Sequence, residues 1–254
     1  MADQETRPSP GNGGTTDASA ARSAKGRRTS SASEATKRRL KAAAQQLFAE
    51  RGFDGVTVQQ IVSAAGQRNN ASLHYHFGSK EELARQLVVD GARRVNDHRL
   101  AMLAELEANG GIDDLRQLMY ALMQPVLSIS EEPDQQSYAR FIANLQASKR
   151  QLLRDAVGDQ WNLGYRLCLQ HIRRLLPALP PELLEQRLSL VGIYGNAALA
   201  AREAALHQRN ERPDRLWGQS FALENYVDTM VATVTCPPSA QTLAQLDRDR
   251  TGQT

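Results

Sequence analysis

The chain has 254 residues, of which 41% are hydrophobic and 23% are charged, so it has the composition of a globular protein of one or two domains. It contains no run of about 18 apolar residues and no apolar segment at its N-terminus, which excludes a membrane-spanning helix and a secretory signal. Cys168 and Cys236 are its only cysteines, too few for a disulfide framework or a four-cysteine zinc site. We therefore expect a cytoplasmic protein.

Charge is distributed unevenly along the chain. Residues 1–80 carry 12 Lys and Arg against 6 Asp and Glu, whereas residues 81–254 carry 19 against 22. A basic first third on an acidic remainder is typical of a polyanion-binding module joined to a second part.

Residues 1–32 contain no Val, Ile, Leu, Phe, Trp or Tyr, so they cannot bury enough surface to offset the entropy of ordering. We expect them to form a disordered arm. Its basic side chains favour contact with DNA, although a solubility tail is an equal alternative. These side chains are Arg22, Lys25, Arg27 and Arg28.

From there the apolar residues recur at helical spacing and no strand-like alternation occurs, which predicts an all-α fold. The first helix begins at the capping box Ser31–Glu34 and ends at Gly52. Two further capping boxes, Thr57–Gln60 and Ser79–Glu82, open the second and fourth helices. The other helices are predicted over residues 71–77, 113–127, 134–148, 150–176, 182–208 and 214–235, with a polar tail over 237–254.

Three short helices, of which the second and third are joined by a tight turn, predict a helix-turn-helix DNA-binding domain over residues 33–79. Leu73 and Phe77 lie four residues apart and should hold the third helix to the core. Thr57 and Lys80 begin the neighbouring helices, where free backbone N–H groups favour a phosphate. Groups suited to base edges and phosphates lie on the third helix and the turn before it. They are Asn69, Asn70, Ser72, His74 and Tyr75.

Over about residues 34–90 the sequence resembles the N-terminal signature of the TetR (tetracycline-repressor) family. The resemblance is carried by Phe53–Thr57, Ile61, Ala64–Gly66 and Leu73–Leu83. It implies an all-α homodimeric transcription regulator, usually a repressor. In this family the first three helices bind DNA, the later helices enclose an effector pocket, and the last two dimerise as a four-helix bundle.

The resemblance also implies roles for single residues. Thr57, Tyr75 and Lys80 would contact phosphates. Arg68, Asn70 and Ser72 would read base edges.

The part of the chain over residues 80–236 should therefore bind an effector and form the dimer. Its inward faces carry Met, Tyr, Phe and Trp side chains that suit a lipophilic or aromatic ligand, although each could equally be core. The candidates are Met102, Met119, Tyr120, Met123, Tyr138, Phe141, Trp161 and Tyr165. Arg140 and Arg166 are candidate anchors for an acidic group on the ligand.

The predicted helix over residues 182–208 is rich in small residues on more than one face, which favours close approach to a second subunit. The small residues are Gly192, Gly195, Ala197, Ala198, Ala200 and Ala201.

No catalytic motif occurs, so we expect neither an enzyme nor a cofactor. His74 and His76 are two residues apart, whereas helical metal ligands favour a spacing of four, so no metal site is expected. The function expected is ligand-released repression at a pseudo-palindromic operator in the nucleoid. An all-α enzyme and a helical scaffold for protein partners, each with a basic tail, are the alternatives.

Overall fold

The computed structural model describes residues 16–132, 135–207 and 214–252, and for residues 16–30 it describes the backbone alone. Every regular element in these ranges is an α-helix, which confirms the predicted all-α class. The helices are α1 (Thr16–Arg51), α2 (Val58–Ala64), α3 (Ala71–Phe77), α4 (Lys80–Ala108), α5 (Leu115–Ser130), α6 (Tyr138–Ser148), α7 (Arg150–Val157), α8 (Leu163–Leu175), α9 (Pro181–His207), α10 (Ala222–Thr235) and α11 (Ala240–Thr251). None of them is long and apolar enough to cross a membrane.

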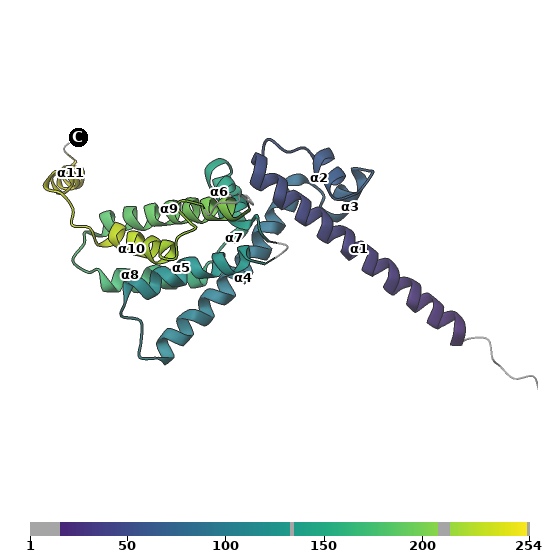
Figure 1. The fold of residues 1–254 in the computed structure, drawn as a ribbon, viewed down its shortest axis with the longest axis horizontal. Helices are drawn as coiled ribbons and strands as arrows, with labels where there is room; N and C mark the ends of the chain where they lie inside the picture. Colours follow the sequence, from purple (N-terminus) through teal and green to yellow (C-terminus); the bar gives the residue numbers. More distant parts are fainter. Residues whose placement is uncertain (1–15, 133–134, 208–213, 253–254) are drawn as a thin grey trace, which may run out of the picture.

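Figure 1 shows α1, α2 and α3 at one end of the molecule and α5, α8, α9 and α10 packed together in the other part. Helix α4 runs between them and contacts α1 and α3 near its start and α5 and α8 further along.

The predicted capping residues mark where α2 and α4 begin, with a complete capping box at Thr57 and only the hydroxyl bond of one at Ser79. The Thr57 hydroxyl accepts from the Gln60 N–H at 3.3 Å, and the Gln60 side chain accepts from the Thr57 N–H at 2.8 Å. The Ser79 hydroxyl accepts from the Glu82 N–H at 3.0 Å. Gly78, with a φ of +77°, ends α3 in a conformation that side chains with a Cβ rarely adopt.

The prediction of a disordered arm is wrong for residues 16–32, which form the first half of α1. This stretch holds five alanines, three arginines and one lysine, all good helix formers, and no proline, so a helix is compatible with it even without an apolar face to bury. Residues 1–15 of the predicted arm lie outside the described residues. In Figure 1 this half of α1 projects away from the other helices.

The single helix predicted over 150–176 is divided, because Gly158 takes a φ of +51° after α7 and α8 begins only at Leu163. The polar tail predicted over 237–254 contains a further helix, α11. The Ser239 hydroxyl caps it by accepting from the Thr242 N–H at 3.1 Å. An ion pair of 2.6 Å between Arg250 and Glu182 joins α11 to α9.

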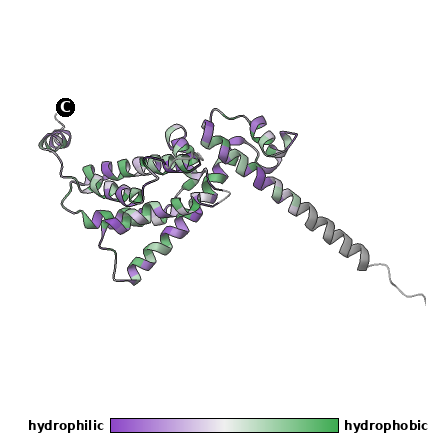
Figure 2. Ribbon diagram, viewed as in Figure 1, coloured by the Kyte–Doolittle hydropathy of each residue, from purple (hydrophilic) through white to green (hydrophobic). Residues whose placement is uncertain are grey.

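Two clusters of buried apolar side chains form the interior. The first cluster contains residues of α1, α2, α3, α4, α6 and α7. In it the centre of the Phe48 ring lies 5.3 Å from that of Phe53 and 5.9 Å from that of Phe141. The second lies among α4, α5, α8, α9 and α10. Figure 2 shows the apolar residues of these helices interleaved with polar ones, as amphipathic helices require. Helices α1, α2 and α3 therefore share their core with α6.

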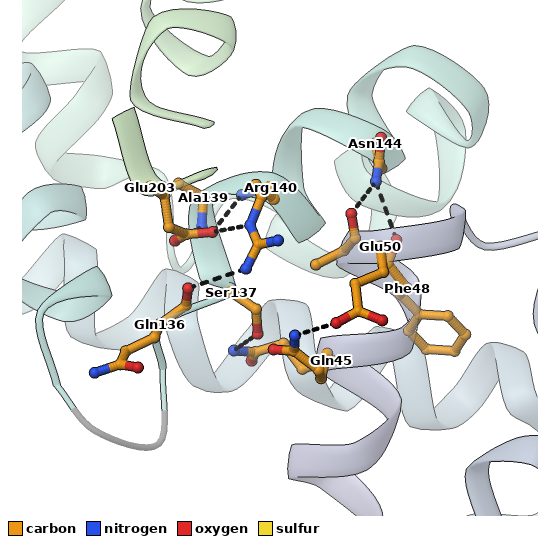
Figure 3. Close-up of polar contacts among 11 residues, drawn as sticks. Gln45, Phe48, Glu50, Gln136, Ser137, Ala139, Arg140, Asn144 and Glu203 are labelled. Carbon is orange, nitrogen blue, oxygen red and sulfur yellow. Dashed lines mark hydrogen bonds and ion pairs between the residues drawn. The ribbon is translucent and has the colours of Figure 1, made fainter. Parts of the chain in front are cut away.

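Polar groups also join α6 to both parts of the molecule (Figure 3). Asn144 donates to the Phe48 and Ala49 carbonyls, each at 3.0 Å, near the end of α1. The buried Glu203 of α9 accepts from the Ala139 N–H at 2.8 Å and the Arg140 N–H at 3.1 Å, at the start of α6. Both bonds satisfy backbone groups that a helix end leaves without partners.

Candidate DNA-binding surface and ligand cavity

The turn between α2 and α3 begins at Gly66, which has a φ of +67°. Leu73 and Phe77 are buried, so the face of α3 that they form packs on the core, as predicted. The opposite face is open to solvent, and 82% of Tyr75 is exposed. Figure 1 shows α2 and α3 at the end of the molecule away from α8, α9 and α10.

The exposed face of α3 carries hydrogen-bonding groups. The Nδ1 atom of His74 lies 2.8 Å from the Gly78 carbonyl oxygen, so it carries a proton and leaves Nε2 for an outside partner. His76 is half-buried and its ring lies edge-on to Tyr75, 5.0 Å away. Ser72 is half-buried beside Gln67, at an oxygen–oxygen distance of 3.5 Å.

The three neighbouring residues of the turn before α3 differ in exposure and in hydrogen bonding. Arg68 is exposed and forms no ion pair within the described residues. Asn69 has a local role, because its Oδ1 accepts from the N–H of Ala71, the first residue of α3, at 2.9 Å. Asn70 is half-buried. Its Oδ1 atom is buried and accepts no hydrogen bond from any residue that the structure describes.

Of the three predicted phosphate contacts, Tyr75 is exposed, whereas the Thr57 and Lys80 side chains form hydrogen bonds within the chain. The Lys80 ammonium donates to the Phe53 carbonyl at 3.1 Å and the Val56 carbonyl at 2.9 Å, above the Phe53 ring. Two of its three N–H groups are therefore used within the chain. The Thr57 hydroxyl is part of the capping box of α2.

A cavity of about 640 Å³ lies among α4 to α10, within the range that holds a drug-sized ligand. Four of the eight predicted ligand residues line it. They are Met123, Tyr138, Trp161 and Tyr165.

The other four predicted ligand residues do not line the cavity. Phe141 packs against Phe48 of α1, because the cavity face of α6 is instead formed by Tyr138, Ala139 and Ile142. Met119 is fully buried in the second core cluster, and Met102 packs against that cluster. Tyr120 lies beside Arg116, whose guanidinium carbon is 5.7 Å from its ring. The apolar spacing identified the inward faces but not which part of each face opens on the cavity.

Polar residues that the sequence did not single out also line the cavity. Tyr226 donates to the Gly195 carbonyl at 3.1 Å, and Asn196 donates to Gln146 at 2.8 Å. Arg99 is 6% exposed and lies on the cavity wall. Burial lowers the pKa of Arg99 and raises the pKa of Tyr165.

Arg140 and Arg166, the predicted anchors, are not part of the cavity lining. Arg140 forms an ion pair of 3.0 Å with Glu203, and Arg166 forms one of 3.1 Å with the exposed Asp159. Cys168 is fully buried, and burial raises the pKa of its thiol to about 11.

The small residues of α9 divide between two faces. A Cβ on Gly192 would lie 3.3 Å from the Tyr165 hydroxyl oxygen, and one on Gly195 would lie 3.2 Å from that of Tyr226. These two glycines make room for tyrosines of the same chain. A different face of α9 presents a stripe of exposed apolar residues at spacings of three and four. The stripe consists of Leu190, Ile193, Tyr194, Ala197 and Ala201.

Comparison with known proteins agrees with this arrangement. The family model described as bacterial regulatory proteins of the TetR family matches residues 40–87, and the tetracycline repressor-like C-terminal domain model matches residues 120–235. The chain is 29% identical over 176 residues to YdgC, an HTH-type transcriptional regulator of Bacillus subtilis, covering 66% of this chain and 88% of YdgC. It is 34% identical over 74 residues to IcaR of Staphylococcus aureus, covering 29% of this chain and 38% of IcaR.

Among solved structures, a TetR-family regulator from Shewanella aligns with a TM-score of 0.46 at 20% identity, covering 76% of this chain and 97% of that one. PfmR of Thermus thermophilus aligns with a TM-score of 0.44 at 17% identity, covering 79% and 99%.

An exposed, polar α3 held on a helix-turn-helix scaffold defines a DNA-binding transcriptional regulator. The chain belongs to the TetR family of such regulators.

Proposed function

We propose that this protein is a homodimeric repressor that leaves its operator when a small, mostly apolar molecule enters the cavity. The observation that carries the proposal is the position of α6. This one helix lines the cavity through Tyr138 and Ile142 and packs on α1 through Phe141. The Staphylococcus relative is by name a negative regulator, which favours repression over activation.

The DNA-binding surface consists of Arg68, Asn70, Ser72, His74 and Tyr75, with Arg68 and Tyr75 the most accessible. Base edges in the major groove present acceptors to the Arg68 guanidinium and the Asn70 amide, and their amino groups can donate to the His74 Nε2. Thr57, Asn69 and Lys80 position this surface, because their side chains are engaged in caps and turns. Lys80 retains one N–H for a phosphate.

The apolar stripe on α9 is the surface proposed to form the dimer. A twofold axis brings the same residues of two subunits together, so Ile193 and Tyr194 would each be buried against the partner. The two copies of α3 would then lie about 34–36 Å apart, one turn of DNA, and read a pseudo-palindrome.

Repression requires two states with different affinities for DNA. The ligand favours the state in which the two reading helices do not match successive major grooves, and only its differential affinity for that state can shift the equilibrium. Enzymatic activity is not part of the proposal, since the relatives are transcriptional regulators.

Selection of duplexes from a random library tests the proposal. The protein should enrich a pseudo-palindrome and bind it with two subunits per site. A thermal-shift screen of mixed metabolites should then find compounds that release the selected duplex. Enrichment of no sequence would contradict the regulator, and release by polar sugars or divalent metals alone would contradict the apolar effector.

A further inference from the structure

Arg99 is a buried cation in an otherwise largely apolar cavity. Its side chain leaves α4 and is 6% exposed, and no carboxylate lies within 4.0 Å of it in the described parts of the chain. A buried charge is costly without a partner, and a guanidinium stays protonated even where burial lowers its pKa. Its position therefore calls for an explanation.

Pro125 explains part of that position. A proline inside α5 has no N–H, so the carbonyl four residues earlier, on Ala121, lacks its helical donor. The Arg99 Nε donates to this carbonyl at 2.9 Å, and Nη2 donates to the Leu122 carbonyl at 2.8 Å. These two bonds use two of the five guanidinium N–H groups. A neutral amide could fill the same role, so they do not account for the charge.

The surroundings of Arg99 suit an anion. Its guanidinium carbon lies 5.9 Å from the Tyr165 ring, and Tyr138 and Tyr165 line the same cavity. Burial raises the pKa of both phenols, so both remain neutral hydrogen-bond donors. The other charged residues of the lining, Arg154, Asp155 and Asp159, are exposed. The buried part of the lining therefore carries one positive charge and no negative one.

We propose that the ligand of this cavity is a mostly apolar molecule with one carboxylate, which Arg99 binds through its remaining N–H groups with help from the Tyr165 hydroxyl. The bonds to Ala121 and Leu122 hold the guanidinium plane, so the free edge is oriented before the ligand arrives. Val95, Val126 and Ile142 supply apolar surface for the rest of the molecule. The proposal rests on the assignment of this cavity as the effector site.

Matched ligands test the proposal on the wild-type chain. Decanoate, 1-decanol and decylamine share one tail, and 4-phenylbutyrate and 4-phenylbutanol form an aromatic pair. Calorimetric titration should show each carboxylate binding about tenfold or more tightly than its alcohol, because a charge-assisted hydrogen bond in a buried site is stronger than a neutral one. Equal affinities, tighter binding of the amine, or no binding of either acid would overturn the proposal.

Arg99→Gln keeps an N–H for the Ala121 carbonyl and removes the charge. The preference, which is the ratio of the affinities for the carboxylate and for its alcohol, should therefore fall to about threefold or less. Tyr165→Phe should reduce the preference less. Arg250→Gln is the matched control, since it removes an exposed charge whose partner, Glu182, also lies outside the lining, and it should leave the preference unchanged. Retention of the full preference in Arg99→Gln would contradict the role of Arg99.

If Arg99→Gln does not fold, the wild-type crystal structure with decanoate decides the matter. A carboxylate oxygen within hydrogen-bond distance of Arg99 supports the proposal, and one placed elsewhere overturns it. These ligand measurements need no DNA. Acid binding without operator release would therefore support the anion site and contradict the effector role.

Discussion

Single residues on the DNA-binding surface differ in whether their side chains already form hydrogen bonds within the chain. The sequence analysis expects Arg68 to read base edges and Lys80 to contact phosphate, and it counts Asn69 among the groups suited to either. In the structure Asn69 accepts from the first N–H of α3 and Lys80 donates to two carbonyls, while Arg68 remains exposed. The difference arises because local backbone groups compete with DNA for the same side chains.

Arg68→Ala should weaken binding to the selected operator by about 1–3 kcal/mol and relax the preference at one base pair, because it removes a free donor pair suited to guanine. Competition binding against single-base variants of the operator measures this. Arg248→Ala on the distant α11 is the control and should have no effect on the preference. A uniform loss on all duplexes would instead make Arg68 a phosphate contact.

Lys80→Met should lower the free energy of unfolding by about 1–2 kcal/mol, because the Phe53 and Val56 carbonyls lose their donor. Urea unfolding measures the effect on stability, and the salt dependence of binding to random duplex DNA measures any phosphate contact. Unchanged stability together with a salt slope reduced by about one would mean that Lys80 acts on DNA alone.

Helix α6 is tied to helices in both parts of the molecule. Ser137 precedes its first residue but does not cap it, and the Ser137 hydroxyl instead accepts from Gln45 of α1 at 3.2 Å. Glu203 of α9 provides the cap, so α6 is held at its start by α9 and near its end by α1. The sequence does not predict this, because Glu203 and Ala139 are 64 residues apart.

Glu203→Ala should cost about 3 kcal/mol of unfolding free energy, because Arg140 and two backbone N–H groups lose a buried carboxylate. Glu131→Ala is the matched control. It removes an exposed carboxylate from the pair with Arg202 and should cost about 0.5 kcal/mol or less. Similar unfolding curves for the two variants would show that Glu203 does not hold α6.

The sequence predicted most helices well where capping residues mark their ends, as at Thr57, Ser79 and Gly78. It failed where propensity acts without an apolar pattern, which is why α11 and the first half of α1 were missed. It also merged α7 and α8, because the apolar spacing continues across Gly158. In the cavity the pattern found Tyr138 and Trp161 but missed Arg99, whose role depends on Pro125 of another helix.

At the scale of the whole molecule, the exposed stripe on α9 should form the dimer. Ile193→Glu places a charge at its centre twice in a symmetric pair, so sedimentation velocity should show monomers with weak operator binding. Leu206→Glu is the control, because Leu206 is exposed on a different side of α9 and should leave the dimer intact. If the Ile193→Glu variant remained a dimer, the interface would have to lie on another surface.

The central claim is sequence-specific DNA binding that a cavity ligand reverses. The most direct measurement is the affinity for the selected duplex and for a scrambled duplex over a range of salt concentrations, with and without saturating decanoate. We expect the selected duplex to bind about 10³-fold or more tightly, with a steep salt dependence, and decanoate to reduce that affinity. Equal affinity for the two duplexes, or specific binding that decanoate leaves unchanged while it occupies the cavity, would contradict the account.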